Sequence, residues 1–209
     1  MTAVPPSGVF NFTSLQTGYA GVLLGANGEL TSTRFNGEDT QSIEVTNMSQ
    51  ANGTEAYIVG LSNLTSLGDM SDKYMQKLVI ESDNVRLEKL ILGNTHKDYY
   101  NPYWGTTVTS GSVNDSPKIG LTSATHLKEF NFYNCSTYGS SLDFSNCKVI
   151  EKILLTGSGV TSVMFPTGGI MKEVRLPASV RSITIDSCNS LTPSKFSIGG
   201  YDYTGVDRI

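Results

Sequence analysis

The chain has 209 residues, of which 38% are hydrophobic and 16% are charged, and its formal net charge is −4. This length fills one or two domains, and the low charged fraction with 21 glycines is typical of a β-rich particle protein rather than a cytosolic enzyme. An acidic chain without a basic stripe is not expected to bind nucleic acid.

Membrane and export signals are not expected either. No apolar run approaches the roughly 20 residues that a membrane helix needs, so we expect no membrane insertion. The first residues, MTAVPPSGVFNFTSLQTGYAGVLLG, do not combine a basic start with a following apolar stretch. A cleaved secretion signal is therefore not expected.

Residues 1–60 are predicted to form a small antiparallel β-hairpin region that caps the structure after it. Asn-Gly pairs favour tight hairpin turns, and here they lie between short β-type runs such as GVLL, STRF, SIEV and AYIV. The three pairs are Asn27-Gly28, Asn36-Gly37 and Asn52-Gly53.

The next segment starts a repeating pattern that an insertion then interrupts. Leu78 with Ile80, and Leu90 with Leu92, show the apolar-x-apolar spacing of strands with one buried face. The segment LEKLILGN closely resembles a later segment, LKEFNFYN, that starts 40 residues downstream. That interval is about 19 residues longer than one repeat, which predicts an insertion over residues 95–122.

The insertion carries the most suggestive surface chemistry of the chain. Its segment THKDYYNPYWGTT places Tyr99, Tyr100, Tyr103 and Trp104 around an Asn-Pro turn. Aromatic side chains on a polar loop provide large contact area at low entropic cost, which suits protein interfaces and sugar stacking. We name these four residues as the candidate interaction surface, with an internal plug on an irregular coil as the alternative.

One template occurs three times after the insertion: LKEFNFYNC, IEKILLTGS and MKEVRLPAS start 23 and then 21 residues apart. A second series of apolar-x-apolar strands is interleaved with it, in LDFSNC, VTSVMFP and VRSITIDSC. Two strands per period of about 21 residues predict coils that stack around a thin core. Phe196 and Ile198 are predicted to open a further coil, after which YDYTGVDRI either covers this end or leaves it to dock.

A charged pair precedes the strands of the first series. Each pair contains one glutamate and one lysine, as Glu88-Lys89, Lys128-Glu129, Glu151-Lys152 and Lys172-Glu173. Stacked coils turn these pairs into columns of alternating sign, which we interpret as a soluble corner with weak ion pairs. A charged ridge that docks a partner is the alternative.

Metal and catalytic interpretations find little support in the sequence. Each cysteine follows a strand, where repeat proteins place Asn or Cys at a bend, and the spacings of Cys135, Cys147 and Cys188 fit no zinc pattern. A structural role is favoured for them over a disulfide or a metal site. His96 and His126 lack a recognisable catalytic partner.

Solenoids can also be carbohydrate-active enzymes, so paired carboxylates need attention. Asp143 and Asp186 lie about two coils apart on the second strand series, which places them roughly 10 Å from each other. That separation is at the loose limit for an inverting carboxylate pair, and solvated faces are the favoured interpretation.

The segments LTSLGDMSDKY, LEKLILGN, NCSTYGSSLDFSNC and GSGVTSVMFPTGGIMKEVRLPASVRSITI resemble, in this order, leucine-rich-repeat-like solenoids of structural proteins from bacteriophages of gut bacteria. The resemblance covers about Leu61 to Ile198 and brings no catalytic motif. It implies a virion component of the tail or tail tip, assembled in the host cytoplasm. Other virion proteins would be its partners, together with further copies of the chain in a homo-oligomer and a glycan or protein of the host surface.

The sequence therefore predicts an all-β protein: a leucine-rich-repeat-like two-sided β-solenoid over residues 61–209, preceded by the β-hairpin region of residues 1–60. We expect a non-enzymatic virion structural protein without catalytic, cofactor or metal sites. A bacterial cell-surface adhesion module and a polysaccharide-degrading solenoid enzyme are the two alternatives.

Overall fold

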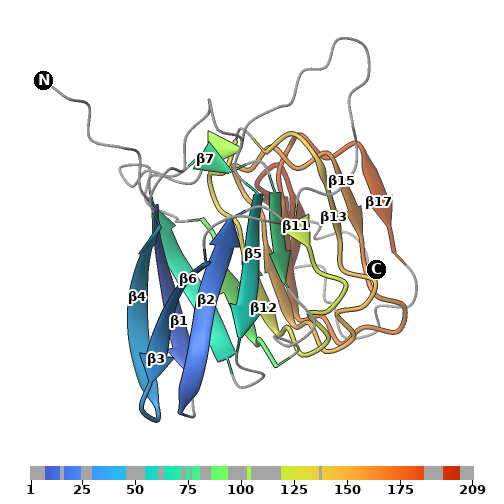
Figure 1. The fold of residues 1–209 in the computed structure, drawn as a ribbon. Helices are drawn as coiled ribbons and strands as arrows, with labels where there is room; N and C mark the ends of the chain where they lie inside the picture. Colours follow the sequence, from blue (N-terminus) through green and yellow to red (C-terminus); the bar gives the residue numbers. More distant parts are fainter. Residues whose placement is uncertain are drawn as a thin grey trace, which may run out of the picture.

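The computed structural model describes residues 8–14, 17–24, 30–45, 55–60, 64–71, 74–75, 77–80, 86–93, 103–104, 119–136, 138–185 and 195–202. The chain is nearly all β and forms a β-solenoid of about four turns with coils of about 22 residues, which confirms the predicted fold class (Figure 1). The described residues contain no helix long and apolar enough to cross a membrane.

A nine-stranded sheet forms one side of the molecule and runs through both the antiparallel region and the solenoid. Its solenoid strands pair in parallel, as expected for coils that stack. In spatial order the strands are β4 (Asp39–Val45), β1 (Gly8–Ser14), β6 (Leu64–Ser71), β9 (Lys89–Ile91), β12 (Glu129–Asn131), β14 (Lys152–Leu154), β16 (Glu173–Leu176), β18 (Phe196–Ile198) and β19 (Tyr201–Asp202).

The register of this sheet follows the sequence repeat. Phe130 lies opposite Leu90 on one side and Ile153 on the other, and Val174 lies opposite Phe196. Equivalent template positions therefore stack, and the copy after the long interval pairs directly with the copy before it. The predicted strand series and the predicted opening of a coil at Phe196 are both confirmed.

The opposite side of the molecule is formed by a five-stranded and a three-stranded sheet. Asn146 bridges the described coils where these sheets meet, because its Nδ2 atom donates to the carbonyl oxygen of Thr122 at 3.2 Å. The five-stranded sheet contains β3 (Leu30–Phe35), β2 (Gly18–Leu24), β5 (Glu55–Gly60), β8 (Lys77–Ile80) and β11 (Ile119–Gly120), and the three-stranded sheet contains β13 (Ser141–Asp143), β15 (Ser162–Met164) and β17 (Ser182–Thr184).

The antiparallel region extends both sides of the solenoid. Strand β1 pairs with β6, and β2 pairs with β5, in both cases in antiparallel fashion, so antiparallel strands adjoin the first coil at both sheets. Two of the three predicted hairpin turns are wrong. The Asn36-Gly37 turn links β3 to β4, and Asn52-Gly53 falls between β4 and β5, yet the partners lie in different sheets. Only Asn27-Gly28 falls between paired neighbours, β2 and β3.

The predicted insertion over residues 95–122 extends too far at its C-terminal end. Ile119 and Gly120 form β11, which pairs in parallel with β8 and so belongs to a coil. Within the insertion, Tyr103 and Trp104 form β10 (Tyr103–Trp104), which pairs with β7 (Tyr74–Met75). The short motif Ile-Gly gave no strand signal, because two residues cannot show an alternation.

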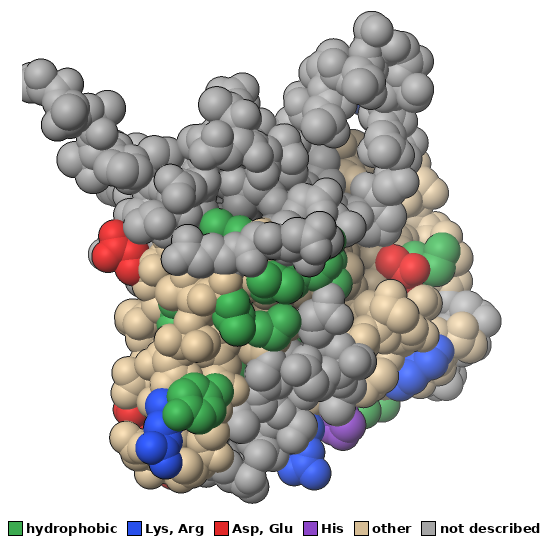
Figure 2. All heavy atoms as spheres, in the orientation of Figure 1, with side chains coloured by type: hydrophobic (Ala, Val, Ile, Leu, Met, Phe, Trp, Pro, Cys, Tyr) green, Lys and Arg blue, Asp and Glu red, His purple; other side chains and the backbone are tan. Residues whose placement is uncertain are grey.

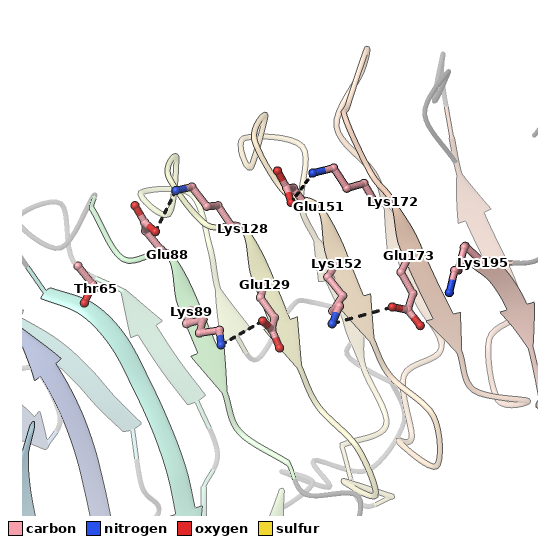
Figure 3. A pocket seen from close by; sticks show the side chains of 10 residues that line it. All are labelled: Thr65, Glu88, Lys89, Lys128, Glu129, Glu151, Lys152, Lys172, Glu173 and Lys195. Atoms are coloured by element: carbon pink, nitrogen blue, oxygen red, sulfur yellow. Dashed lines mark ion pairs between the residues drawn. The ribbon is translucent and has the colours of Figure 1, made fainter. Parts of the chain in front are cut away.

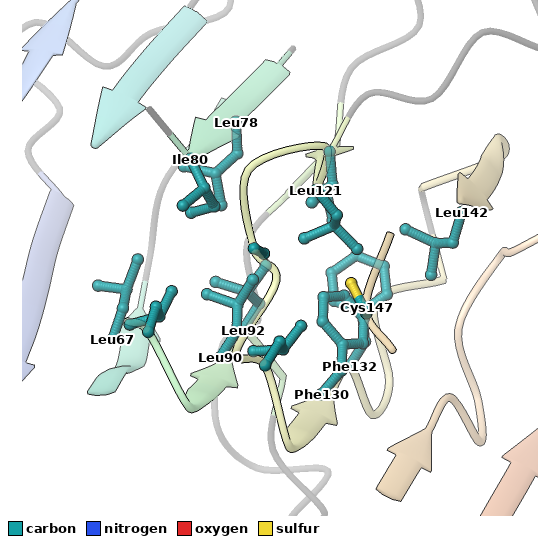
Figure 4. Close-up of a cluster of buried hydrophobic side chains, with 14 of the residues drawn as sticks. Leu67, Leu78, Ile80, Leu90, Leu92, Leu121, Phe130, Phe132, Leu142 and Cys147 are labelled. Atoms are coloured by element: carbon teal, nitrogen blue, oxygen red, sulfur yellow. The ribbon is translucent and has the colours of Figure 1, made fainter. Parts of the chain in front are cut away.

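One hydrophobic core runs between the two sides, from Phe10 to Phe196. Figure 4 shows its central part, which includes Leu67, Leu90 and Phe130. Its centre is aromatic: Phe130 of β12 meets Phe144 edge-on with ring centroids 5.2 Å apart, and Phe132 meets Tyr138 at 5.0 Å. The Tyr138 hydroxyl donates to the carbonyl oxygen of Ser141 at 2.8 Å, which satisfies its only buried polar group. This cluster joins the nine-stranded sheet to the chain segment around β13.

The C-terminal edge of the nine-stranded sheet is formed by β19, which pairs with β18 in antiparallel fashion. Gly199 and Gly200 connect the two strands with positive φ angles of 63° and 86°, a two-residue turn that suits glycine. At least the start of YDYTGVDRI therefore folds back on the last strand. Residues 203–209 lie outside the described residues.

Candidate functional site

The charged pairs of the repeat form a continuous surface feature on the outer face of the nine-stranded sheet (Figure 3). We call it the charged ladder. Its outer column precedes the strands and its inner column lies at their first residues. The ladder consists of Glu88, Lys128, Glu151 and Lys172 in the outer column and Lys89, Glu129, Lys152, Glu173 and Lys195 in the inner column.

The backbone fixes the rungs of the ladder in register. The carbonyl oxygen of Glu88 accepts hydrogen bonds from the N–H groups of Lys128 and Glu129 at 2.8 and 3.0 Å. The carbonyl oxygens of Lys128 and Glu151 accept the same two bonds from the charged pairs of the following coils. Each pair therefore lies directly beside the next, at the strand spacing of about 4.8 Å.

The order of the two charges is reversed in every coil, and this reversal produces attraction along both columns. In the outer column, Nζ of Lys128 lies 2.9 Å from Glu88 and Nζ of Lys172 lies 2.8 Å from Glu151. In the inner column the corresponding pairs are Lys89–Glu129 at 3.3 Å and Lys152–Glu173 at 4.0 Å. An unchanged order would have stacked like charges on neighbouring strands. The predicted columns of alternating sign are confirmed.

These ion pairs contribute little to folding, because the lysine side chains remain between 42 and 65% exposed. The ladder instead surrounds a solvent-open groove of about 540 Å³, with Thr65 at one end and Lys195 at the other. The groove thus presents a fixed pattern of charge to solvent. A surface of this kind is suited to charge complementarity rather than to burial of a small molecule.

A mixed row borders the inner column on the same outward face. It runs through Ile91, Asn131, Leu154 and Arg175, which lie opposite one another on successive strands. Leu154 is only 8% exposed, and Nε of Arg175 donates to Glu173 at 3.2 Å. These residues place apolar area and a fixed guanidinium beside the charged columns.

Tyr133 lies beyond this row, close to the same charges. Burial raises the pKa of Tyr133, and Glu173 adds to this shift. A hydrogen bond with the Thr156 side chain and the charge of Arg175 act in the opposite direction on the same pKa. The phenol therefore stays neutral near pH 7, where it is hydrogen-bonded to the Thr156 side chain.

A second surface feature lies on the outward face of the five-stranded sheet. Hydrophobic side chains gather there in Figure 2, which views the molecule from this side. Across β3, β2, β5 and β8 the register aligns Leu30, Leu23, Tyr57 and Val79 in one row. Leu30 is 54% exposed, and Tyr19 near the other end of β2 is 60% exposed. Exposed apolar area of this kind is typical of contact surfaces.

The structure describes only two of the four residues of the predicted aromatic surface. Tyr103 and Trp104 lie on β10, where Tyr103 is opposite Tyr74 and Trp104 is opposite Met75. Tyr99 and Tyr100 lie outside the described residues. The interaction surface of Tyr99, Tyr100, Tyr103 and Trp104 stays a prediction.

Some of the other candidate residues lie within the described part of the chain and others lie outside it. Cys135 and Cys147 are buried, and no disulfide joins them within the described part of the chain. The Cys135 thiol donates to the carbonyl oxygen of Leu92 at 3.7 Å, at a bend as predicted. His126 and Asp143 are exposed, with Asp143 accepting a hydrogen bond from the Ser145 N–H group at 2.8 Å. His96, Asp186 and Cys188 lie outside the described residues. Among the described side chains, no group of three His, Cys, Asp or Glu residues is placed to hold a metal ion.

Sequence reasoning found most of the ladder but missed its last member and its neighbours. Lys195 directly precedes the apolar residue Phe196, as Glu173 directly precedes Val174, but Ser194 replaces the usual charged partner. Arg175 and Tyr133 become part of the site only through strand register, which the sequence repeat could have supplied.

Comparison of the chain with protein-family models, with curated protein sequences and with solved structures found no match. A function can therefore be inferred only from the sequence and from the physical properties of the surface.

Proposed function

We propose that the protein is a non-enzymatic bacteriophage virion structural protein, acting as a rigid scaffold and interaction surface in the tail or tail tip. The observation that carries the proposal is the nine-stranded sheet, which continues from the antiparallel region through every coil over one core. A continuous sheet resists bending, because each strand is hydrogen-bonded to its neighbours along the whole molecule.

Two features of the surface support a role in assembly. The charged ladder lines an open groove on the nine-stranded sheet, and the five-stranded sheet on the other side of the molecule exposes Tyr19 and Leu30. A chain with contact surfaces on two sides is suited to packing among other virion proteins and further copies of itself. The sequence resemblance to solenoids of phage structural proteins also supports a role in virion assembly.

A non-enzymatic role is also consistent with the chemistry of the ladder. Each of its four glutamates lies within 4.0 Å of a lysine. A glycoside hydrolase of the usual kind needs one carboxyl group that keeps its proton to act as a general acid. The four ladder glutamates instead pair with lysines of neighbouring coils on a surface that is open to solvent.

The direct test is mass spectrometry of purified phage particles from a host that carries the gene. We expect the protein among the virion components in a fixed ratio to a known tail protein. Its absence from particles, with recovery on the bacterial surface, would overturn the proposal in favour of the adhesion module. Release of reducing sugars from host polysaccharide by the pure protein would overturn the non-enzymatic part.

A further inference from the structure

The charged ladder has a symmetry that identifies its partner. We propose that it docks a second copy of this chain across a two-fold axis parallel to the strands, between β12 and β14. This inference rests on the proposed function in the sense that a structural protein of a particle packs against its own copies.

The pairing follows from the alternation of charge in both columns. A two-fold axis parallel to the strands places the outer faces of the two copies against each other. Each residue then faces residues at the same position along the strands of the second copy, but the coils of the second copy run in the reverse order. Glu88 then faces Lys172 of the second copy, and Lys128 faces Glu151; the inner column pairs Lys89 with Glu173 and Glu129 with Lys152. All contacts between the columns join opposite charges, as an isologous interface requires.

The ends of the groove fit the same arrangement. The coil of Lys195 faces the coil of Thr65 in the second copy, so the lysine meets hydroxyl groups rather than a like charge. Shifting the axis by half a coil places it on a strand. Every residue of the ladder then faces a residue of its own sign. Axes in the neighbouring gaps join opposite charges but pair fewer of them, so the axis between β12 and β14 matches the largest number of charges.

Side chains beside the ladder add apolar contact area to the ion pairs of the proposed interface. Ile91, Leu154 and the aliphatic part of Arg175 lie beside the inner column on the same face. Sheets that pack face to face with nearly aligned strands are a common arrangement in proteins. Apolar area beside charged groups is a combination that occurs in specific interfaces.

The test exchanges charges in blocks that keep the four lysine–glutamate ion pairs of the ladder within the chain. Each block alone also places like charges side by side on β12 and β14 of the same chain, whereas the chain with both blocks does not. Block A carries Glu88→Lys, Lys89→Glu, Lys128→Glu and Glu129→Lys. Block B carries Glu151→Lys, Lys152→Glu, Lys172→Glu and Glu173→Lys. It also carries Arg175→Gln, because the arginine would otherwise lie beside the lysine introduced at position 173 of the same chain. The matched reference for block B is the single variant Arg175→Gln. Association is measured by mass photometry and light scattering over a range of concentration and salt.

We expect the unchanged chain to dimerise, with an affinity that falls as salt is raised. Block A alone and block B alone should each weaken dimerisation at least about tenfold, because like charges then face each other. An equimolar mixture of the two variants should form heterodimers, since each block A residue then faces an opposite charge. The chain with both blocks should dimerise again.

Melting temperatures of all variants provide the folding control, and recovery in the mixture cannot come from unfolded chains. A wild-type chain that stays monomeric, or a dimer that is insensitive to the block exchanges, would overturn the inference. Neither outcome touches the proposed virion role, which the particle mass spectrometry tests independently.

Discussion

Burial controls the chemistry of Cys147 at the residue scale. Burial, with a smaller contribution from Asp143, raises the pKa of the Cys147 thiol to about 12, whereas its ordinary value is 9.0. At a given pH below 9 the native protein therefore holds about a thousandfold less thiolate than the unfolded chain. We expect iodoacetamide at pH 8 to alkylate Cys147 at least a hundredfold more slowly in the native protein than in denaturant, as followed by peptide mass spectrometry.

Equal alkylation rates in the two states would contradict the burial of this thiol.

The raised pKa of Cys147 also makes the stability of the protein depend on pH. The folded state keeps the proton more tightly than the unfolded state, so the contribution of Cys147 to the free energy of unfolding is unaffected below about pH 9. It is lost as the pH rises from about 9 toward about 12.

Gly93 provides a second test at the scale of one residue, because it is buried where β9 ends against the following coil. A Cβ atom at this position would meet backbone atoms of Phe132 and Tyr133, which cannot move aside without breaking the sheet. We expect Gly93→Ala to lower the free energy of unfolding by more than about 2 kcal/mol, as measured by urea denaturation.

Gly120→Ala is the matched control, since the nearest atoms to its Cβ belong to Val79 at 3.6 and 3.7 Å, an ordinary contact. Its free energy of unfolding should stay within about 0.5 kcal/mol of the parent chain. Similar losses for the two variants would show that the close approach at Gly93 is not what makes glycine necessary there.

Single positions differ in how far the sequence predicts them. Gly157, with a φ of 74°, lies at a corner between strands, where the run Thr-Gly-Ser-Gly already indicates a turn. Gly93 occurs in the similar-looking run Leu-Gly-Asn, yet its reason is the approach of a chain segment 40 residues away. Such a contact depends on the packing of coils and leaves no local signal.

At the scale of elements, alternation predicted the strands well and turn chemistry predicted their partners poorly. Strands of the coils carry two or three apolar residues at spacing two, and β12, β14 and β16 lie where this pattern placed them. An Asn-Gly pair indicates a reversal of the chain but not which strand it reaches. At Asn36-Gly37 the chain crosses from one sheet to the other because β4 completes its pairing with β1 instead.

Phe144 tests the joint between the two sides of the solenoid. Its ring is buried against Phe130, and no smaller side chain can reach across the same space. We expect Phe144→Ala to destabilise the protein by about 3–5 kcal/mol, because it removes a large apolar side chain and leaves a cavity. Met164→Ala, at an exposed position on the neighbouring strand, should change the free energy of unfolding by less than about 0.5 kcal/mol. A small effect of Phe144→Ala in thermal and urea unfolding would show that the sides are joined elsewhere.

For the whole molecule, the sequence predicted two kinds of structure but not their junction. Residues 1–60 and 61–209 differ in composition and repeat, and that difference suggested a boundary. In the structure both parts contribute to the same sheets, because β1 pairs with β6 and β5 pairs with β8. Phe10, Phe12 and Ile58 belong to the same core as the coils. A local sequence pattern indicates where a strand lies but not which distant strand it pairs with, so the junction could not be predicted.

This continuity predicts that residues 61–209 do not fold independently. Without the first 60 residues, β6 and β8 lose the strands along their outer edges, and the adjoining core loses its aromatic cover. The complete chain should unfold in urea in one cooperative transition, followed alike by circular dichroism and fluorescence. The fragment 61–209 expressed alone should aggregate or lack such a transition, whereas co-expression with residues 1–60 should recover a soluble complex. A fragment that unfolds cooperatively at the midpoint of the complete chain would show instead that the solenoid is a separate domain and that the antiparallel strands only lie against it.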